Sequence, residues 1–198
     1  MLCGWGETPS GHKGIHALRV DASTTTIGIA ILTDDNGLTK LKYSEYYKPN
    51  KKVSKLEMYI AAQRYVVDLA DDFKIDEFVI EEYAKFMKGN STAKTIIPLA
   101  ILNTYIQIGV LQGLKIQPQV LNVMKIRHTL KKSKTLPAKE EMPDLVADHL
   151  GIDFPWVKWR GKRRSENWDV ADAIAVALAH IKIQSSPKPK PRSKKRKK

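Results

Sequence analysis

Residues 15–32, IHALRVDASTTTIGIAIL, decide the fold. They read as a strand that ends on a carboxylate, a tight polar turn at 23–26 and a second strand that runs back beside the first. The apolar residues Ala17, Leu18 and Val20 bring Asp21 to the end of a buried strand. A charge at the edge of a core needs compensation, and a bound cation is a common source of it. Asp21 is therefore the first functional candidate, the alternative being that its side chain caps the turn.

Composition favours one basic, intracellular domain. The chain has 198 residues, 42% of them hydrophobic, which suffices for one well-cored domain. The net charge is +13, and the eight basic residues within 188–198 leave +5 for the rest, so we expect a polyanionic partner such as nucleic acid. The single cysteine, Cys3, excludes an intramolecular disulfide and a zinc site built on cysteines.

The ends of the chain differ from its middle. We expect a flexible leader at 1–14, one folded domain at 15–184 and a disordered basic tail at 185–198. No run of about 18 apolar residues predicts a membrane span, so we expect no membrane partner. The expected location is cytoplasmic or nucleoid-associated, or nuclear or organellar if the Pro/Lys-rich tail is a targeting signal.

The middle of the chain alternates strands and helices. Asn36-Gly37 predicts a hairpin into a third strand at 38–47, so three antiparallel strands open the domain. The later elements follow from periodicity and caps: a helix at 53–73, a central parallel strand at 78–80, a helix at 92–114, an edge strand at 115–123, a helix at 143–150, a loop at 154–167 and a helix at 168–184.

Carboxylates recur at the ends of these elements. Glu81 follows the fourth strand, and Asp169 and Asp172 lie three residues apart on one face of the last helix. Glu82 is the weaker candidate, because neighbours on a strand point to opposite faces. The alternative for the helix pair is an N-cap at Asp169 with Asp172 in the first turn, an arrangement that stabilises a helix by about 1 kcal/mol.

Three motifs carry a resemblance to a known family: RVDASTTTIGIAIL, VIEEYAKFMKGN and WDVADAIAVALAH, in that order. Across residues 15–183 the chain resembles the RuvC-type Holliday junction resolvases of the RNase H-like nuclease superfamily, with a phage-encoded member as one possibility. The resemblance implies an α/β, RNase H-like fold with a five-stranded mixed sheet, three antiparallel strands followed by parallel strands, flanked by helices.

The resemblance also implies the chemistry. It assigns Asp21, Glu81, Asp169 and Asp172 to an acidic quartet that binds two Mg²⁺ ions, for which Mn²⁺ can substitute. Two such ions about 4 Å apart activate a water and stabilise the leaving oxygen in phosphodiester hydrolysis. The implied activity is resolution of four-way DNA junctions by paired symmetric nicks, by a homodimer that associates through its long central helix. In this chain that helix is apolar on more than one face.

Basic and aromatic residues complete the predicted DNA interface. Lys125 and Lys139 fall where the family has basic residues near the scissile phosphate. The other predicted contacts are Arg127, Lys131, Lys132 and Lys134, the aromatic residues Tyr83 and Phe86, and the basic residues Arg160, Lys162, Arg163 and Arg164. The alternatives are a solvated basic surface and aromatic rings that pack in the core.

Rival functions remain open. Within the same fold, the substrate could be other branched DNA or an RNA–DNA hybrid. Residues 21–25 also resemble the first phosphate loop of sugar-kinase and actin-like ATPases, but those proteins duplicate the fold and no second loop follows. A module that binds branched DNA without cutting is the third class, and four clustered carboxylates argue against it because they repel phosphate unless metal is present.

Overall fold

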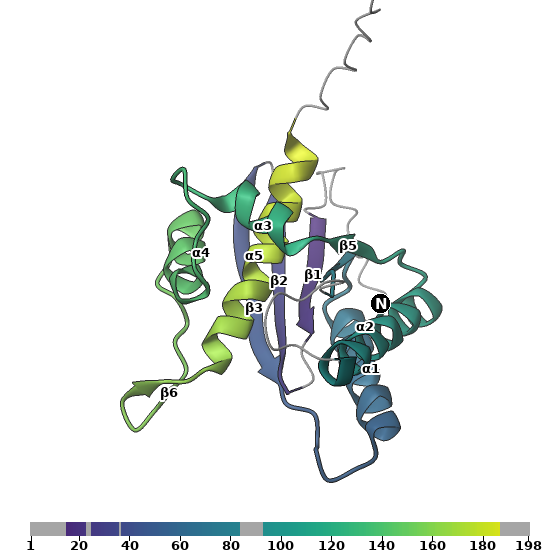
Figure 1. The fold of residues 1–198 in the computed structure, drawn as a ribbon. Coiled ribbons are helices and arrows are strands. Elements are labelled where there is room, and N and C mark those ends of the chain that lie inside the picture. The colour runs from purple at the N-terminus through teal and green to yellow at the C-terminus, as the bar shows by residue number, and fades with distance from the viewer. Residues whose placement is uncertain (1–14, 23–24, 36, 84–92, 187–198) are drawn as a thin grey trace, which may run out of the picture.

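The computed structural model describes residues 15–22, 25–35, 37–83 and 93–186 (Figure 1). Its centre is a five-stranded mixed sheet with the strand order β3-β2-β1-β4-β5. Helices cover both faces of this sheet, so the predicted α/β architecture is confirmed. The leader at 1–14, the predicted contact Phe86 and the end of the tail from residue 187 lie outside the described residues.

The three opening strands are antiparallel, as expected. β1 (Ile15–Ala22) pairs with β2 (Ile27–Asp35), which pairs with β3 (Leu38–Tyr47). Gly37 adopts a φ of 84° at the turn between β2 and β3, a conformation that glycine reaches without strain. β4 (Glu77–Glu81) then runs parallel to β1, and β5 (Gln119–Leu121) runs parallel to β4 at the edge.

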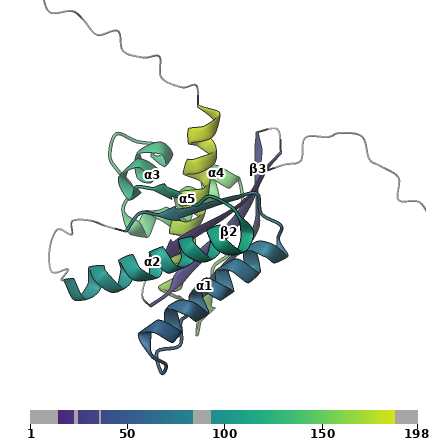
Figure 2. The same ribbon diagram turned by 90° about the vertical axis from the view of Figure 1, so that its right-hand side faces the viewer.

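One face of the sheet is covered by α1 (Lys55–Asp72) and α2 (Ala93–Leu114). Ser54 caps α1 in a capping box with Glu57. The two helices run side by side in the same direction (Figure 2), since Tyr59 contacts Tyr105 and Gly109 lies against Gln63. Together they bury the odd-numbered residues of β2 from 27 to 31.

The opposite face is covered by α3 (Val123–Leu130), α4 (Met142–Leu150) and α5 (Glu166–Ser185), with the short 3₁₀ helix η1 (Lys139–Glu141) before α4. α5 crosses the sheet over β1 and β2 (Figure 1), and its alanine-rich surface is buried there. Gly151 ends α4 with a φ of 65°, as the sequence predicted.

Two local predictions were wrong. α5 begins at Glu166, two residues before the predicted start, and the segment predicted as a loop contains a two-stranded hairpin, β6 (Lys158–Trp159) and β7 (Lys162–Arg163). The side chain of Asn167 holds this hairpin to α5, because it bonds the backbone N–H and carbonyl of Val157 and the carbonyl of Arg164. The predicted fifth strand is only three residues long, and α3 begins directly after it.

Candidate active site

Strand register brings Asp21 and Glu81 together. Val20 is paired with Ile80 in the parallel ladder between β1 and β4, so the two carboxylates follow at the same end of adjacent strands. Val20 and Ile80 both pack under α1 and α2, and the alternation of strand side chains therefore turns Asp21 and Glu81 toward α5.

The first turns of α5 bring Asp169 and Asp172 to the same place. Gly28, the partner of Asp21 in the ladder between β1 and β2, allows this approach. A Cβ atom on Gly28 would lie 2.0 Å from the carbonyl oxygen of Asp169 and 2.4 Å from its carbonyl carbon. Only a glycine leaves room for α5 at this point, and glycine inside a strand is a recognised signal for such close approach.

Burial, together with repulsion between neighbouring carboxylates, raises the pKa values within the cluster. Burial, followed by the charges of Glu81, Asp172 and Asp169, raises the pKa of Asp21 well above its usual range. Burial and the charge of Asp172 raise the pKa of Glu81 to about 7. Burial is also the main cause of the raised pKa values of Asp169 and Asp172. The cluster therefore lacks sufficient positive charge to balance it.

Lys139 supplies part of that charge. Its ammonium lies 3.3 Å from Oδ1 of Asp169 and 3.5 Å from Oδ2 of Asp172. Burial alone would lower the pKa of Lys139, but the charges of Asp172, Asp169 and Asp21 outweigh burial and raise it. Arg127 is a second positive charge near the cluster, since its charge lowers the pKa values of Glu81 and Asp172.

The donor set suits a hard divalent cation. All four groups are carboxylates, the ligands that Mg²⁺ and Mn²⁺ prefer, and they are partly buried with only partial charge compensation. Within the described ranges no three His, Cys, Asp or Glu side chains converge in the geometry of a formed metal site. Lys139 is the present cationic partner of Asp169 and Asp172, so a metal ion held by these carboxylates would take the place of its ammonium.

The N-cap alternative for Asp169 is wrong. The N-cap of α5 is Ser165, so Asp169 lies one turn inside the helix. The carboxylate of Glu82 accepts a hydrogen bond from Nδ2 of Asn122, the N-cap residue of α3. Asn103 of α2, which the sequence did not single out, fixes the end of β4 through a 2.9 Å hydrogen bond to the carbonyl of Glu81.

The basic residues that the sequence predicted to contact DNA lie in different parts of the structure. Lys139 and Arg127 lie beside the carboxylates, and Arg127 also donates to the carbonyl of Pro137. Lys132 forms a 3.0 Å ion pair with Asp148 on α4. The side chains of Lys125 and Lys134 are exposed and that of Lys131 is partly buried. Tyr83 is partly buried just after β4.

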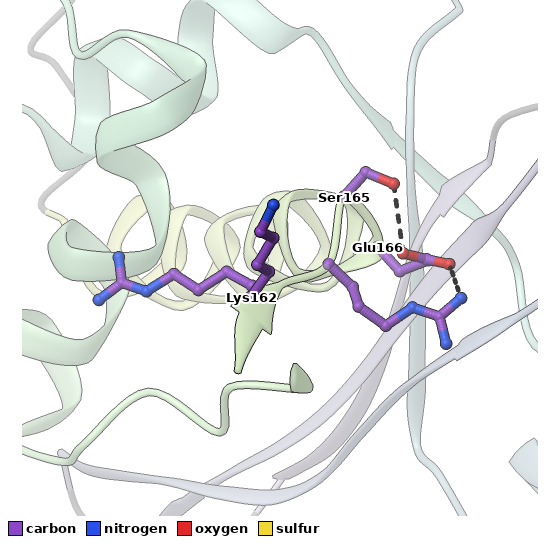
Figure 3. Close-up of a pocket in the computed structure, with 5 residues that line it drawn as sticks. Lys162, Ser165 and Glu166 are labelled. Carbon is purple, nitrogen blue, oxygen red and sulfur yellow. Dashed lines mark hydrogen bonds and ion pairs between the residues drawn. The ribbon is translucent and has the colours of Figure 1, made fainter. Parts of the chain in front are cut away.

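The β6–β7 hairpin is attached to the start of α5 (Figure 3). Arg164 forms a 2.8 Å ion pair with Glu166, whose side chain is only 5% exposed, and Lys48 from the segment after β3 binds the same carboxylate. Arg163 lies over the ring of Trp156 at 3.7 Å. Lys162 lines the surface pocket beside Glu166, and Arg160 has a φ of 48° in the turn. The role of Lys48 was missed, because 118 residues separate it from Glu166.

No family model and no curated protein sequence matches the chain. Solved structures do match its fold. Thermus thermophilus RuvC in complex with a Holliday junction substrate superposes with a TM-score of 0.65 at 16% identity, over 86% of this chain and 94% of that one. The yeast mitochondrial Holliday junction resolvase Ydc2 gives 0.61 at 12%, over 89% and 81%. The fowlpox virus resolvase with its junction DNA gives 0.54 at 14%, over 87% and 100%. The chain therefore has the fold of the RuvC-type Holliday junction resolvases.

Proposed function

We propose that this protein is a metal-dependent endonuclease that resolves four-way DNA junctions by paired symmetric nicks. The observation that carries the proposal is the cluster of four partly buried carboxylates, Asp21, Glu81, Asp169 and Asp172, at one end of the sheet. A cluster of this charge repels a phosphodiester, so it requires cations before it can act on DNA.

The four carboxylates would hold Mg²⁺, with Mn²⁺ as a substitute, and two ions are proposed for each site. When bound, such ions activate water and stabilise the charge that develops on the phosphate. Asp21 is the central ligand in this proposal because the other three carboxylates all raise its pKa. Lys139 would leave Asp169 and Asp172 when the cations bind, and its ammonium would then be free to contact a DNA phosphate.

The DNA substrate is proposed from the fold and from the basic residues around the site. Two of the structures with this fold contain Holliday junction DNA. In the present chain, Lys139 and Arg127 lie on one side of the carboxylates and the β6–β7 hairpin lies at the start of α5. These basic side chains suit contacts with the phosphate backbone. Such contacts position DNA without reading its sequence.

A second copy of the chain is the proposed partner of α2. The exposed fractions of Ile97, Ile101, Ile108 and Leu111 are 56%, 39%, 43% and 43%, and these residues form one stripe along the helix. A pocket of about 280 Å³ lies on the same stripe beside Tyr105. By length and composition alone, α2 could also cross a membrane, but a helix at a subunit interface meets that criterion too. Two copies would present two active sites to the two strands of a junction that must be cut.

Cleavage of a substrate panel tests the proposal. Labelled four-way junction, flap, plain duplex and RNA–DNA hybrid are incubated with Mg²⁺ and either the wild-type protein or Asp21→Asn, with Glu82→Gln as a matched carboxylate control. We expect paired symmetric nicks in the junction from the wild type and Glu82→Gln, and a loss of about 10³-fold or more for Asp21→Asn with DNA binding retained.

The other results identify the alternatives. Preferential cutting of the flap or the hybrid would support the assigned active site but would show that the proposed substrate is wrong. Metal-dependent cutting that survives in Asp21→Asn would contradict the assignment of the active site to this carboxylate cluster. Junction binding without cutting of any substrate would identify a binding module.

A further inference from the structure

A pocket lies where the first turns of α1 and α2 meet, on the face of the sheet opposite α5. It encloses about 330 Å³, within the range of about 300–1,000 Å³ that is typical of ligand pockets. Its apolar lining comes from Val53, Met58, Tyr59 and Pro98. Met58 and Tyr59 are 8% and 5% exposed and form a buried floor, whereas Val53 is 40% exposed at the rim.

Three lysines surround this apolar lining. Lys51 and Lys55 come from the start of α1 and the segment before it, and Lys94 comes from the first turn of α2. All three side chains are exposed, and none forms an ion pair with another residue in the described ranges. The nearest carboxylate in sequence, Glu57, instead bonds Ser54 in the capping box. The lysines therefore offer uncompensated positive charge around an apolar cavity.

The packing between α1 and α2 keeps this pocket in shape. Gln63 of α1 donates a 2.9 Å hydrogen bond to the carbonyl of Tyr105, and the ring of Tyr105 contacts that of Tyr59. Pro98 lies one turn before Leu102, which is fully buried. The part of α2 that lines the pocket is therefore on the face that turns toward the sheet. The proposed dimer stripe, which begins at Ile97 and Ile101, lies on a different face of the helix.

Contacts of Lys48 and Asn103 link the segments around the pocket to the elements that carry the acidic cluster. Lys48, three residues before Lys51, binds Glu166 at the start of the helix that carries Asp169 and Asp172. On the other side, Asn103 of α2 bonds the carbonyl of Glu81. The lysine-rich segment before α1 thus begins at the active-site end of the sheet.

We propose that this pocket is a second DNA site, in which Lys51, Lys55 and Lys94 bind backbone phosphates and the apolar lining accepts one unpaired base. A positively charged surface beside aromatic side chains binds single-stranded nucleic acid without sequence preference, and Tyr59 is the aromatic residue of this lining. In a branched substrate, a base pair that opens at the branch point supplies an unpaired base close to the strand that is cut. The proposal rests on the proposed function, because it assumes that branched DNA is the substrate.

Site-specific crosslinking tests the base pocket. p-Benzoylphenylalanine replaces Val53, and irradiation is carried out with a labelled four-way junction in EDTA so that no cutting occurs. We expect crosslinks at nucleotides next to the branch point. The control places the same probe at Leu38, which is 57% exposed at the far end of β3, where we expect no crosslink. Crosslinks confined to paired nucleotides within the arms, or none at Val53, would overturn the base pocket.

Charge removal tests the phosphate contacts. The variant Lys51→Ala/Lys55→Ala/Lys94→Ala is compared with Lys40→Ala/Lys42→Ala/Lys115→Ala, which removes the same charge from exposed lysines on β3 and after α2. Junction binding is measured against salt concentration in EDTA. Each lost phosphate contact lowers the slope of log K against log salt by about 0.9, so we expect the first variant to lose about 2–3 in slope and about tenfold in affinity, and the control to lose far less.

The results separate this inference from the proposed function. If the wild type cuts junctions but both lysine variants bind alike and Val53 does not crosslink, the pocket assignment is wrong and the nuclease assignment stands. If the wild type neither binds nor cuts a junction, both assignments are wrong.

Discussion

Gly28 determines how closely the helix that carries two of the carboxylates approaches the strand that carries the first. It is paired with Asp21 in the sheet, and its missing side chain leaves room for the backbone of Asp169. The neighbours that a Cβ atom would meet are backbone atoms of Asp169 and Val170, which cannot move without moving α5 itself. The separation between Asp21 and the pair Asp169 and Asp172 therefore depends on this glycine.

Gly28→Ala is expected to impair activity more than stability. The added methyl group displaces the start of α5, and overpacking of this kind costs about 1–3 kcal/mol of the free energy of unfolding. Because the displacement also separates Asp169 and Asp172 from Asp21, we expect cleavage to fall by at least about 100-fold. Thermal unfolding and single-turnover cleavage measure the two effects.

Gly113→Ala is the matched control. A Cβ atom there would meet only Cγ1 of Val67, at 3.1 Å, a contact that a small side-chain shift relieves, and alanine favours the helix by about 1 kcal/mol. We expect this variant to cut normally. Equal losses of activity in the two variants would contradict the proposal that Gly28 acts by letting α5 approach Asp21.

Single residues differed in how well the sequence predicted them. Asp21 and Glu81 were predictable because an apolar run that ends on a carboxylate determines both the strand end and the face. The close approach at Gly28 was readable in principle from a glycine inside an apolar strand. Lys139 was named only from the family resemblance and Lys48 was missed, because the contacts of each depend on how segments 30 and 118 residues apart fold against each other.

At the scale of elements, Glu166 joins three segments: α5, the β6–β7 hairpin and the segment after β3. Burial of Glu166 raises its pKa, but hydrogen bonds from Lys48 and Arg164 outweigh burial and lower it to about 2. A carboxyl with a folded-state pKa below its unfolded value of about 4.5 stabilises the fold above that pH. Its contribution disappears as the pH falls from about 4.5 to about 2.

Glu166→Gln is expected to lower stability at neutral pH by about 1–3 kcal/mol, because Lys48 and Arg164 lose their shared partner. The variant should also lose less stability than the wild type as the pH falls from 4.5 to 2, because it lacks the group that is protonated. Urea unfolding at pH 7, 4.5 and 3 measures both effects. The control Asp71→Asn removes an exposed ion pair with Lys74 and should change stability by less than about 0.5 kcal/mol. A parallel pH dependence of wild type and Glu166→Gln would contradict this account.

The hairpin and the start of α5 show why some elements were mispredicted. Strands of two residues have no detectable alternation, and the hairpin depends on the stacking of Arg163 on Trp156 and on the hydrogen bonds of Asn167. α5 extends to Glu166 because these tertiary contacts, rather than a strong N-cap, define its first turn. By contrast, the long helices and central strands were predictable because their apolar periodicity is strong.

At the scale of the whole molecule, a net positive charge is combined with an acidic cluster. The net charge of +13 would attract DNA, the proposed substrate, whereas the carboxylate cluster would accept phosphate only with cations. The apolar stripe of α2 lies apart from the acidic cluster, since Ile97, Ile101 and Ile108 are exposed on the opposite face of the sheet from α5. A second copy on this stripe would therefore leave the acidic cluster accessible.

Ile101→Glu is expected to give a monomer, because it places a charge within the apolar stripe proposed to form the interface. Analytical ultracentrifugation measures the mass, and a supercoiled cruciform plasmid distinguishes paired cuts, which linearise it, from single nicks, which relax it. We expect the wild type to linearise the plasmid and Ile101→Glu mainly to nick it. Leu38→Glu, at a residue that is 57% exposed on β3, is the control and should remain dimeric. A monomeric wild type would contradict the proposed use of α2.

The most direct test of the central claim is an anomalous diffraction map from crystals of the protein soaked in Mn²⁺. The account predicts two Mn²⁺ peaks that both contact Asp21, one completed by Glu81 and the other by Asp169 and Asp172, with Lys139 displaced from the helix pair. A map with no manganese at these four carboxylates, and with the ammonium of Lys139 still bound to Asp169 and Asp172, would contradict it.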